Sequence, residues 1–416
     1  MNMSTSFRKS YPIFSLTVAV SFCLSSARVQ AADWPQWRGP NRDGKASGFN
    51  APKAWPKELT QKWKVAVGKG DATPALAGDK LYVFTRQEEN EVVRSVEAGT
   101  GKEVWQDKYE AQGATGAAGA HPGPRSSPTV ADGKVVTFGV RGTLSCLEAA
   151  SGKKLWRKDG AAGDWPKFFT ASSPIVVDGL CIAQVGGENN GAMAAYDLAS
   201  GNEKWKWSGD GTAYSSPVLL TLDGTKVLVA ETDKNLVAVG VANGKLLWQT
   251  PFAGKGMSGH NDATPIVDGQ TIIYSGSGRG TKAVKLEKKG DDFTANELWS
   301  NAEQSVQYNS PVLKDGFVFG ISGRDTFFCL NAKNGQTAWT APSGGKRGFG
   351  SIVDAGSVLM ALTPSSQLIV LEPSDKEFKQ LTSYKAAESE TYAYPVPAGS
   401  RVYVKDQDSL TLWSFE

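Results

Sequence analysis

The chain has 416 residues, of which 45 are Lys or Arg and 42 are Asp or Glu. Three of the basic residues fall within the first 31 positions, so the remainder carries 42 residues of each sign. This balance gives no electrostatic basis for binding nucleic acid or an anionic membrane surface. A chain of this length usually folds as two or more domains, unless it is an array of repeats.

Residues 1–31 have the features of a secretory signal. A basic start precedes an apolar run over 13–24, and Val29-Gln30-Ala31 fits the small-residue rule for cleavage. The run is too short to span a bilayer. Cys23 would suit a lipoprotein, but Phe22 stands before it where a small residue is preferred. We therefore expect a signal peptide over 1–31, no membrane span, and export to the periplasm or the cell exterior.

An arm over 32–58 follows, and it opens with WPQWRGPNRDG. Trp34 and Trp37 are three residues apart, and the neighbouring prolines favour an extended left-handed helix with three residues per turn. Both indoles then lie on one side, where we expect them to anchor the arm in grooves of the domain without a backbone ladder. Two roles stay open: a seal that contributes nothing to binding, or a partial cover of a binding site.

Eight repeat units occupy the rest of the chain. One marker is a Gly four residues before a Trp, at Trp105, Trp156, Trp205, Trp248 and Trp339. A second marker upstream places a Pro before a short apolar run, at positions 74, 128, 174, 217, 265 and 311. Weaker copies begin at Gly350 and Ala393, which gives a spacing of about 41 to 54 residues, within the range of propellers and solenoids.

Each unit reads as four short strands broken at Gly-containing turns. Repeated four-stranded sheets favour radial closure, so we expect an all-β, eight-bladed β-propeller of antiparallel blades over 59–416. The Asn-Gly dipeptides at 243–244 and 334–335 predict tight two-residue hairpins between third and fourth strands. The Asp-Gly pairs predict hairpin turns rather than calcium ligands, at Asp132, Asp178, Asp223, Asp268 and Asp315.

The eighth unit contains only three strands between Ala393 and Glu416. The segment Leu59–Gly68 resembles the Trp-bearing fourth strands, so we expect it to complete the last blade, with Trp63 buried where the ring closes. In the seventh unit Gln380 stands where the pattern requires Trp, and Pro373 interrupts the hairpin. This blade is predicted to dock most weakly.

The degenerate pattern A-x-D-x-x-[TSN]-G-x-x-x-W resembles the tryptophan-docking motif of the pyrroloquinoline-quinone (PQQ) repeat family. The resemblance implies an eight-bladed propeller in which a Trp is wedged between neighbouring blades, here Trp63, Trp105, Trp156, Trp205, Trp248, Trp299 and Trp339. Such repeats occur in quinoprotein dehydrogenases, in the outer-membrane assembly propeller lipoprotein and in secreted proteins of unknown role. The resemblance alone does not select a function.

Residues that precede the Pro markers converge on one mouth of a propeller channel, where such folds place a site. The candidates for binding are Asp71, His121, Arg125, Trp165, Lys167, Tyr214, His260, Asn261, Asp262, Tyr308, Arg347 and Tyr392. The aromatic members offer stacking surfaces. The alternative is an inert polar rim.

Quinoprotein dehydrogenases of this fold carry a vicinal Cys-Cys disulfide and a Glu, Asn and Asp set that holds calcium, which is what the resemblance would require here. The chain has no Cys-Cys pair, and Glu188 and Asn189 in GGENNG read as a long hairpin. Cys146 and Cys329 occupy the small first position of the docking motif, which predicts buried thiols. No CxxC or His/Cys spacing suggests a metal site.

We therefore expect an exported, non-catalytic binding or scaffolding propeller, with no confidently assigned cofactor, whose partner is a peptide, a glycan or an envelope protein. The alternative is a quinone-dependent alcohol or sugar oxidoreductase that binds PQQ and calcium at the same mouth. The sequence identifies neither catalytic nor cofactor-binding residues for that alternative.

Overall fold

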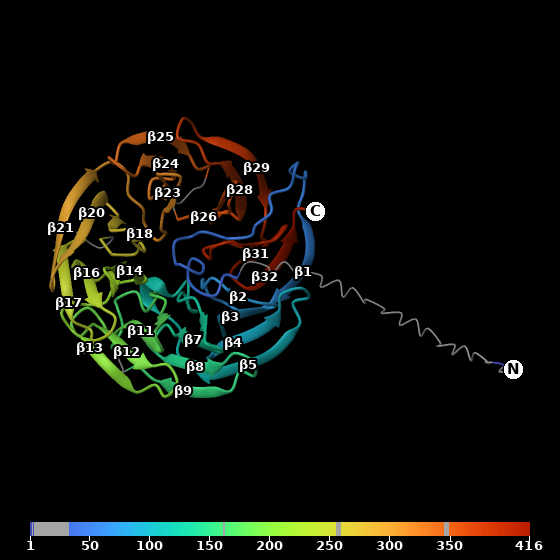
Figure 1. Ribbon diagram of the computed structural model, residues 1–416, viewed down its shortest axis with the longest axis horizontal. Coiled ribbons are helices and arrows are strands. Elements are labelled where there is room, and N and C mark those ends of the chain that lie inside the picture. The colour runs from blue at the N-terminus through green and yellow to red at the C-terminus, as the bar shows by residue number, and fades with distance from the viewer. Residues whose placement is uncertain (2, 4–32, 161–162, 255–258, 345–348) are drawn as a thin grey trace. The chain divides into compact units, whose positions relative to one another are not determined.

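A computed structural model describes residues 1, 3, 33–160, 163–254, 259–344 and 349–416. The signal peptide expected over 1–31 lies almost wholly outside the described residues. Residues Ala31–Glu416 form one compact unit. Its described strands make eight four-stranded antiparallel sheets arranged as a ring, which confirms the predicted eight-bladed propeller (Figure 1).

The first four blades follow one another along the chain. Blade one comprises β2 (Ala75–Ala77), β3 (Lys80–Gln87), β4 (Asn90–Glu97) and β5 (Glu103–Glu110). Blade two, entered through the short 3-10 helix η1 (Gly116–Ala118), comprises β6 (Thr129–Ala131), β7 (Lys134–Phe138), β8 (Leu144–Glu148) and β9 (Lys154–Lys158). Blade three comprises β10 (Ile175–Val177), β11 (Leu180–Val185), β12 (Ala192–Asp197) and β13 (Glu203–Trp207). Blade four comprises β14 (Val218–Leu222), β15 (Thr225–Glu231), β16 (Asn235–Gly240) and β17 (Leu246–Pro251).

The second half of the ring repeats this order. Blade five comprises β18 (Ile266–Asp268), β19 (Thr271–Gly276), β20 (Gly280–Lys289) and β21 (Asp292–Asn301). Blade six comprises β22 (Val312–Lys314), β23 (Phe317–Ser322), β24 (Thr326–Asn331) and β25 (Thr337–Pro342). Blade seven comprises β26 (Ser351–Asp354), β27 (Leu359–Leu362), β28 (Gln367–Glu372) and β29 (Lys379–Lys385). Blade eight comprises β30 (Val396–Ala398), β31 (Arg401–Lys405), β32 (Ser409–Ser414) and β1 (Thr60–Ala66).

The ring closes through β1, the first strand of the chain, which is the outermost strand of the last blade. It pairs antiparallel with β32, from Thr60 opposite Ser414 to Ala66 opposite Ser409. Trp63 of β1 is 9% exposed, and its indole N–H donates to the carbonyl oxygen of Ala98 at 3.2 Å. The predicted closure and the burial of Trp63 are confirmed.

The Trp and the Gly of the docking motif make contact across neighbouring blades. In five places the indole of one blade packs against the positive-φ Gly of the next blade's turn, so closely that an added Cβ would lie 2.4 to 2.9 Å from the ring. The pairs are Trp63 with Gly101, Trp105 with Gly152, Trp156 with Gly201, Trp205 with Gly244, and Trp299 with Gly335. The carbonyl three residues before each Gly accepts the indole hydrogen. Gly is therefore required twice, for its backbone conformation and for the space.

The two remaining docking tryptophans pack differently. Trp339 donates its indole hydrogen to the carbonyl oxygen of Ser374 at 2.8 Å. Trp248 packs against the apolar cluster shared by blades four and five. In blade five the β20–β21 ladder continues as far as Lys289 opposite Asp292, so this hairpin covers Trp248 in place of a short docking turn.

The prediction of two-residue Asn-Gly hairpins is wrong. The backbone N–H of Gly240 bonds the carbonyl of Lys245, and that of Gly244 bonds the carbonyl of Gly240, so the connection is longer than two residues. Gly244 has a φ of 68°, whereas Asn243 keeps a negative φ. The longer turn leaves the carbonyl of Val241 free to accept the indole hydrogen of Trp205.

The Asp-Gly and cysteine predictions are confirmed. Four of the Asp residues, Asp132, Asp178, Asp223 and Asp315, have positive φ at hairpin turns, and the fifth, Asp268, ends β18 at the same place. Cys146 and Cys329 are fully buried opposite Trp156 and Trp339. Burial raises the pKa of both thiols to about 12, so neither is a reactive thiolate.

The residue that replaces Trp in blade seven is Thr382, and the assignment of Gln380 to this position is wrong. Val370 pairs with Thr382, and the following bulge places Gln380 opposite Leu371. Tyr384 is buried nearby and donates from its hydroxyl to the carbonyl oxygen of Pro56 in the arm. The arm therefore supports the blade that has no docking Trp.

A belt of hydrogen bonds links blades along the channel at the residues that precede the Pro markers. The backbone N–H at this position in one blade donates to the hydroxyl at the same position in the next, from Thr73 to Ser127, Ser127 to Ser173, Ser173 to Ser216, and Thr264 to Ser310. Tyr394 of blade eight joins blades six and one in this belt, since its hydroxyl accepts from the N–H of Ser310 and its own N–H donates to the hydroxyl of Thr73. The Ser-Pro and Thr-Pro repeats thus join neighbouring blades at the hub.

The N-terminal arm runs into the channel, where Figure 1 shows its blue segment crossing the centre of the ring. Trp34 is 1% exposed and exchanges two backbone hydrogen bonds with Leu76 of β2, at 2.8 and 2.9 Å. The expected anchoring is confirmed, but the expected absence of a backbone ladder is wrong. Farther along, the arm bonds Asp354 of β26 and Gly399 beyond β30. The arm therefore ties together the innermost strands of blades seven, eight and one, which are consecutive where the ring closes.

Candidate functional site

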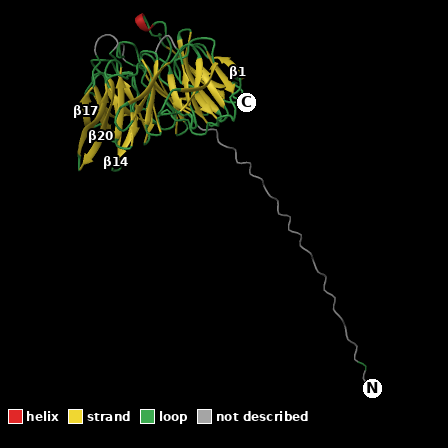
Figure 2. Ribbon diagram, turned by 90° about the horizontal axis from the view of Figure 1, so that it is seen from above, coloured by secondary structure: helices red, strands yellow, loops and turns green. Residues whose placement is uncertain are grey.

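A cavity of about 390 Å³ opens at one mouth of the channel. Residues that enter the innermost strands of all eight blades contribute to its wall, and so does Ala117 of η1, which lies on the rim seen at the top of Figure 2. Eight of the candidate residues line it: Asp71, His121, Arg125, Tyr214, His260, Asp262, Tyr308 and Tyr392. The repeat therefore places these loops together, as the sequence indicated.

Four candidates are not among the lining residues. Trp165 stacks on Phe169 at 6.0 Å, and Lys167 lies 5.6 Å above the Phe168 ring. Asn261 is 2% exposed and is held by backbone carbonyls, because it follows His260 on the opposite side of the chain from the cavity. Arg347 lies outside the described residues.

The arm supplies the floor of the cavity, whereas the sequence left open either a seal without a role in binding or a partial cover of the site. The indole N–H of Trp37 donates to the hydroxyl of Thr264 at 2.8 Å, and its ring meets the edge of Tyr394 at 4.9 Å. Tyr394 was also missed, although it stands directly before Pro395 at the marker position. Both residues line the cavity, so the arm seals the channel and shapes the site at once.

Two buried arginines fix the arm beneath this floor. Arg38 donates to the carbonyl oxygens of Ser310 at 2.9 Å and Pro311 at 2.6 Å. Arg42 donates to those of Ser173 and Pro174, both at 2.8 Å. Burial, together with the neighbouring charge of Arg38, lowers the pKa of Arg42 to about 9. The hub therefore concentrates positive charge below the cavity.

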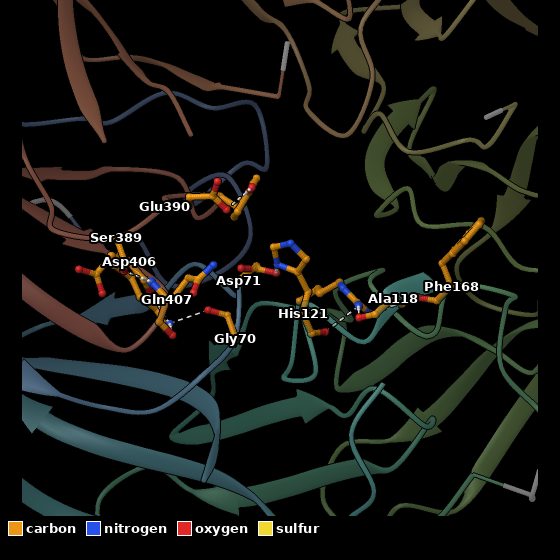
Figure 3. A network of polar contacts seen from close by, with 12 residues as sticks. Gly70, Asp71, Ala118, His121, Phe168, Ser389, Glu390, Asp406 and Gln407 are labelled. Atoms are coloured by element: carbon orange, nitrogen blue, oxygen red, sulfur yellow. Dashed lines mark hydrogen bonds and ion pairs between the residues drawn. The ribbon is translucent and has the colours of Figure 1, made fainter. Parts of the chain in front are cut away.

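One wall contains an oriented imidazole. His121 and Asp71 point toward each other, with Nδ1 of the imidazole 2.9 Å from a carboxylate oxygen (Figure 3). This hydrogen bond raises the pKa of His121 above its usual value, while burial opposes the rise. The edge of the imidazole meets the ring of Tyr392 at 4.9 Å. Arg125 bonds the carbonyl oxygens of His121 and Phe168, so its N–H groups brace the wall.

The network in Figure 3 continues from Gly70 to the closing blade. The ammonium of Lys405, at 1% exposure, donates to the carbonyl oxygens of Gly70 at 2.5 Å and Asp406 at 2.8 Å. Burial lowers the pKa of Lys405 to about 8. This contact ties the last blade to the loop that carries Asp71, and thereby positions the His121 wall.

The opposite wall is aromatic. Phe168 meets His260 at 4.9 Å, and His260 meets Tyr214 at 5.5 Å, both edge to face. The hydroxyl of Tyr214 accepts the backbone N–H of Phe168 at 3.0 Å. Burial raises the pKa of Tyr214, so the phenol stays neutral. These contacts fix the three ring planes around the cavity.

Tyr308 and Asp262 form the third side. Tyr308 has a φ of 57° and is 51% exposed, an unusual backbone conformation for a bulky residue and one that holds its ring at the rim. Its ring meets Phe349 at 5.0 Å. Oδ1 of Asp262 is buried without a hydrogen-bond partner, and burial raises the pKa of this carboxyl to about 7. Asp262 therefore offers an unused acceptor beside the exposed ring.

The residues present do not fit the calcium and quinone set implied by dehydrogenases of this fold. Among the described residues, no group of three or more His, Cys, Asp or Glu side chains could hold a metal ion. Cys146, Cys181 and Cys329 are buried in strands, not at the mouth. Glu188 is exposed in the turn between β11 and β12, as expected for a hairpin, and is not among the lining residues.

In the part of the chain that the structure describes, no helix has the length and apolar character needed to cross a membrane.

Comparison with known proteins extends the resemblance to the PQQ repeat. The chain is 26% identical over 365 residues to "Outer membrane protein assembly factor BamB" of Burkholderia pseudomallei, covering 84% of this chain and 86% of that protein. The solved structure of BamB from Moraxella catarrhalis matches 86% of this chain and 99% of its own, with a TM-score of 0.62 and 16% identity. The quinohemoprotein alcohol dehydrogenase of Comamonas testosteroni matches 92% of this chain and 80% of its own, with a TM-score of 0.70 and 14% identity.

The two structural matches establish the shared propeller fold. A family model described as "Outer membrane protein assembly factor BamB" matches residues 89–341, which is more than half of the sequence. This chain therefore belongs to the BamB family of PQQ-repeat propellers.

Proposed function

We propose that this protein is an exported, non-catalytic scaffold that takes part in the assembly of outer-membrane proteins and engages its partner at the channel mouth. Family membership supports the assembly role, because the matching family model and the Burkholderia relative carry that description. The signal-like sequence over 1–31 supports export to the periplasm or the cell exterior.

The observation that carries the proposal is the construction of the mouth. All eight blades contribute to one cavity, and the arm fills the channel beneath it. The mouth is therefore a cup with a rigid floor, suited to holding a partner on one face of the ring. Exposed Tyr308 at its rim provides an aromatic anchor of the kind that dominates binding energy at interfaces.

An oxidoreductase is the weaker alternative. Asp262 has a pKa near that of a working base, and Asp71 is the other carboxylate on the wall. Neither carboxylate belongs to a described metal cluster, and the cysteines lie elsewhere. Incubation of the purified protein with PQQ and calcium, followed by dye reduction with alcohols or sugars, tests this alternative directly.

The scaffold proposal is tested by deleting the gene in the organism that encodes it and quantifying folded outer-membrane β-barrel proteins. We expect a reduced yield, restored by the unaltered gene and by Leu155→Ala, which changes an exposed residue of outer strand β9. A double variant, Tyr308→Ala with Tyr392→Ala, should restore less. An unchanged yield in the deletion strain would refute the assembly role, and full restoration by the double variant would refute the mouth as the docking site.

A further inference from the structure

We propose that the mouth cavity binds one neutral pyranose ring of a glycan, with the ring stacked on the aromatic wall and its hydroxyls bonded to the carboxylates. This inference rests on the proposed function in one respect, that the channel mouth is the binding site. It names a ligand chemistry that membership of the family does not supply.

The size of the cavity favours a single ring. At about 390 Å³ it lies at the lower end of the range for small-molecule pockets. This volume accommodates one sugar ring together with its substituents, whereas a folded partner or a long peptide would remain largely outside. The floor is rigid, because Trp37 is fixed by its hydrogen bond to Thr264 and its contact with Tyr394.

The walls combine the two surfaces that a pyranose requires. The axial C–H groups of a pyranose form an apolar face that packs on aromatic rings, and its equatorial hydroxyls point outward in the ring plane. Here Tyr308 and Phe349 stand on one side, and Phe168, Tyr214 and His260 stand on the other. The edge-to-face contacts hold these rings in fixed planes, so little side-chain entropy is lost on binding.

The carboxylates supply acceptors for hydroxyls. Oδ1 of Asp262 is buried without a partner, a state that costs free energy until a donor reaches it. Asp71 uses one oxygen for His121 and retains further acceptor capacity. A sugar hydroxyl can donate to Asp262 and accept from a neighbouring donor at the same time, which suits a wall of mixed polarity.

The charges around the cavity favour a neutral ligand. Asp71 and Asp262 on the wall oppose a strong anion. Arg125 on the wall, with Arg38 and Arg42 in the hub beneath the floor, opposes a strong cation. The terminal N–H groups of Arg125 already donate to backbone carbonyls. Arg125 therefore does not present the pair of parallel donors that binds a phosphate or carboxylate in a bidentate manner.

The test uses the purified full-length protein and calorimetric titration with glucose, galactose, mannose, N-acetylglucosamine and their β-linked disaccharides. Glucosamine, glucuronic acid and a short aromatic peptide serve as charged or non-sugar probes. We expect saturable binding of at least one neutral sugar. Tyr308→Ala should weaken this binding about tenfold, since one stacking contact contributes that much. Asp262→Leu should weaken it further by removing the acceptor.

Phe293→Ala is the matched control, because it removes a partly exposed aromatic ring from the β20–β21 hairpin and leaves the mouth intact. Melting temperatures of all variants establish that they fold. The inference is refuted if no neutral sugar binds, if binding survives Tyr308→Ala unchanged, or if only the charged probes or the peptide bind. The deletion assay is independent, so loss of the sugar proposal leaves the scaffold proposal standing, and the reverse also holds.

Discussion

Blade six offers a matched pair of glycines that isolates the energy of tryptophan docking. Gly335 has a φ of 71°, and a Cβ there would lie 2.4 Å from the indole of Trp299. Gly316 has a φ of 81° in the β22–β23 hairpin, and a Cβ there would meet nothing within 4 Å. Substitution of either by Ala therefore introduces similar backbone strain, but only one substitution disturbs the contact between blades.

The expected magnitudes follow from these geometries. The left-handed conformation costs an L-residue about 1–2 kcal/mol, and this cost applies to both Gly316→Ala and Gly335→Ala. Overpacking against a buried ring adds about 1–3 kcal/mol at Gly335. The free energy of unfolding should therefore fall by about 1–2 kcal/mol for Gly316→Ala and by about 2–5 kcal/mol for Gly335→Ala.

Urea denaturation followed by tryptophan fluorescence measures both values. Displacement of Trp299 would also break its hydrogen bond to the carbonyl oxygen of Ala332, 2.8 Å in length, which adds to the difference. Equal losses of stability in the two variants would refute the docking account, because backbone strain alone would then explain the requirement for Gly.

Three further predictions address the closure, the arm and the mouth. Trp63→Ala should lower the free energy of unfolding by about 3–5 kcal/mol, as for other buried aromatic residues; a loss below 1 kcal/mol in urea denaturation would contradict a closing role. Trp34→Ala should lower the melting temperature markedly, whereas Trp37→Ala should chiefly weaken ligand binding at the floor; the reverse pattern would show that the two positions have exchanged roles. For Asp262, burial raises the folded-state pKa from 3.8 to about 7, so its stabilising contribution is fully present below pH 4 and is lost as the pH rises through 7. Denaturation at pH 4.5 and 7.5 should show this decline for the unaltered chain relative to Asp262→Asn, and parallel pH profiles would refute it.

Part of the candidate site could be predicted from the repeat pattern. The Pro markers located the loops of the mouth because strand connectivity in a repeat forces equivalent loops onto the same face. The markers could not predict that Asp262 lines the cavity and that Asn261 does not. Which of these two side chains faces the cavity depends on the backbone twist where the loop enters β18. Trp165 was placed on the correct face, but Phe169 and Arg141 hold its ring away from the cavity lining.

The sequence by itself determined the number of blades, the strand order within them, the closing strand and the tryptophans that pack between blades. These features follow from residue periodicity and turn chemistry, which act over a few residues and repeat along the chain. The bulge that puts Thr382 rather than Gln380 in the docking position already lies beyond that range, because it depends on the pairing register with β28.

Only the tertiary structure decided the path of the arm. Its partners Leu76, Ser173, Ser310 and Gly399 belong to different blades and come together only after the ring has closed. The arm is a series of turns and single bridges, with positive φ at Arg38 and Arg42, and not the extended left-handed helix expected from its prolines. Such a segment has no periodic pattern of its own, so its place is set by the carbonyl and N–H groups that the hub presents. Those groups exist as a set only in the folded ring, and for this reason the floor of the site could not be predicted from the order of residues.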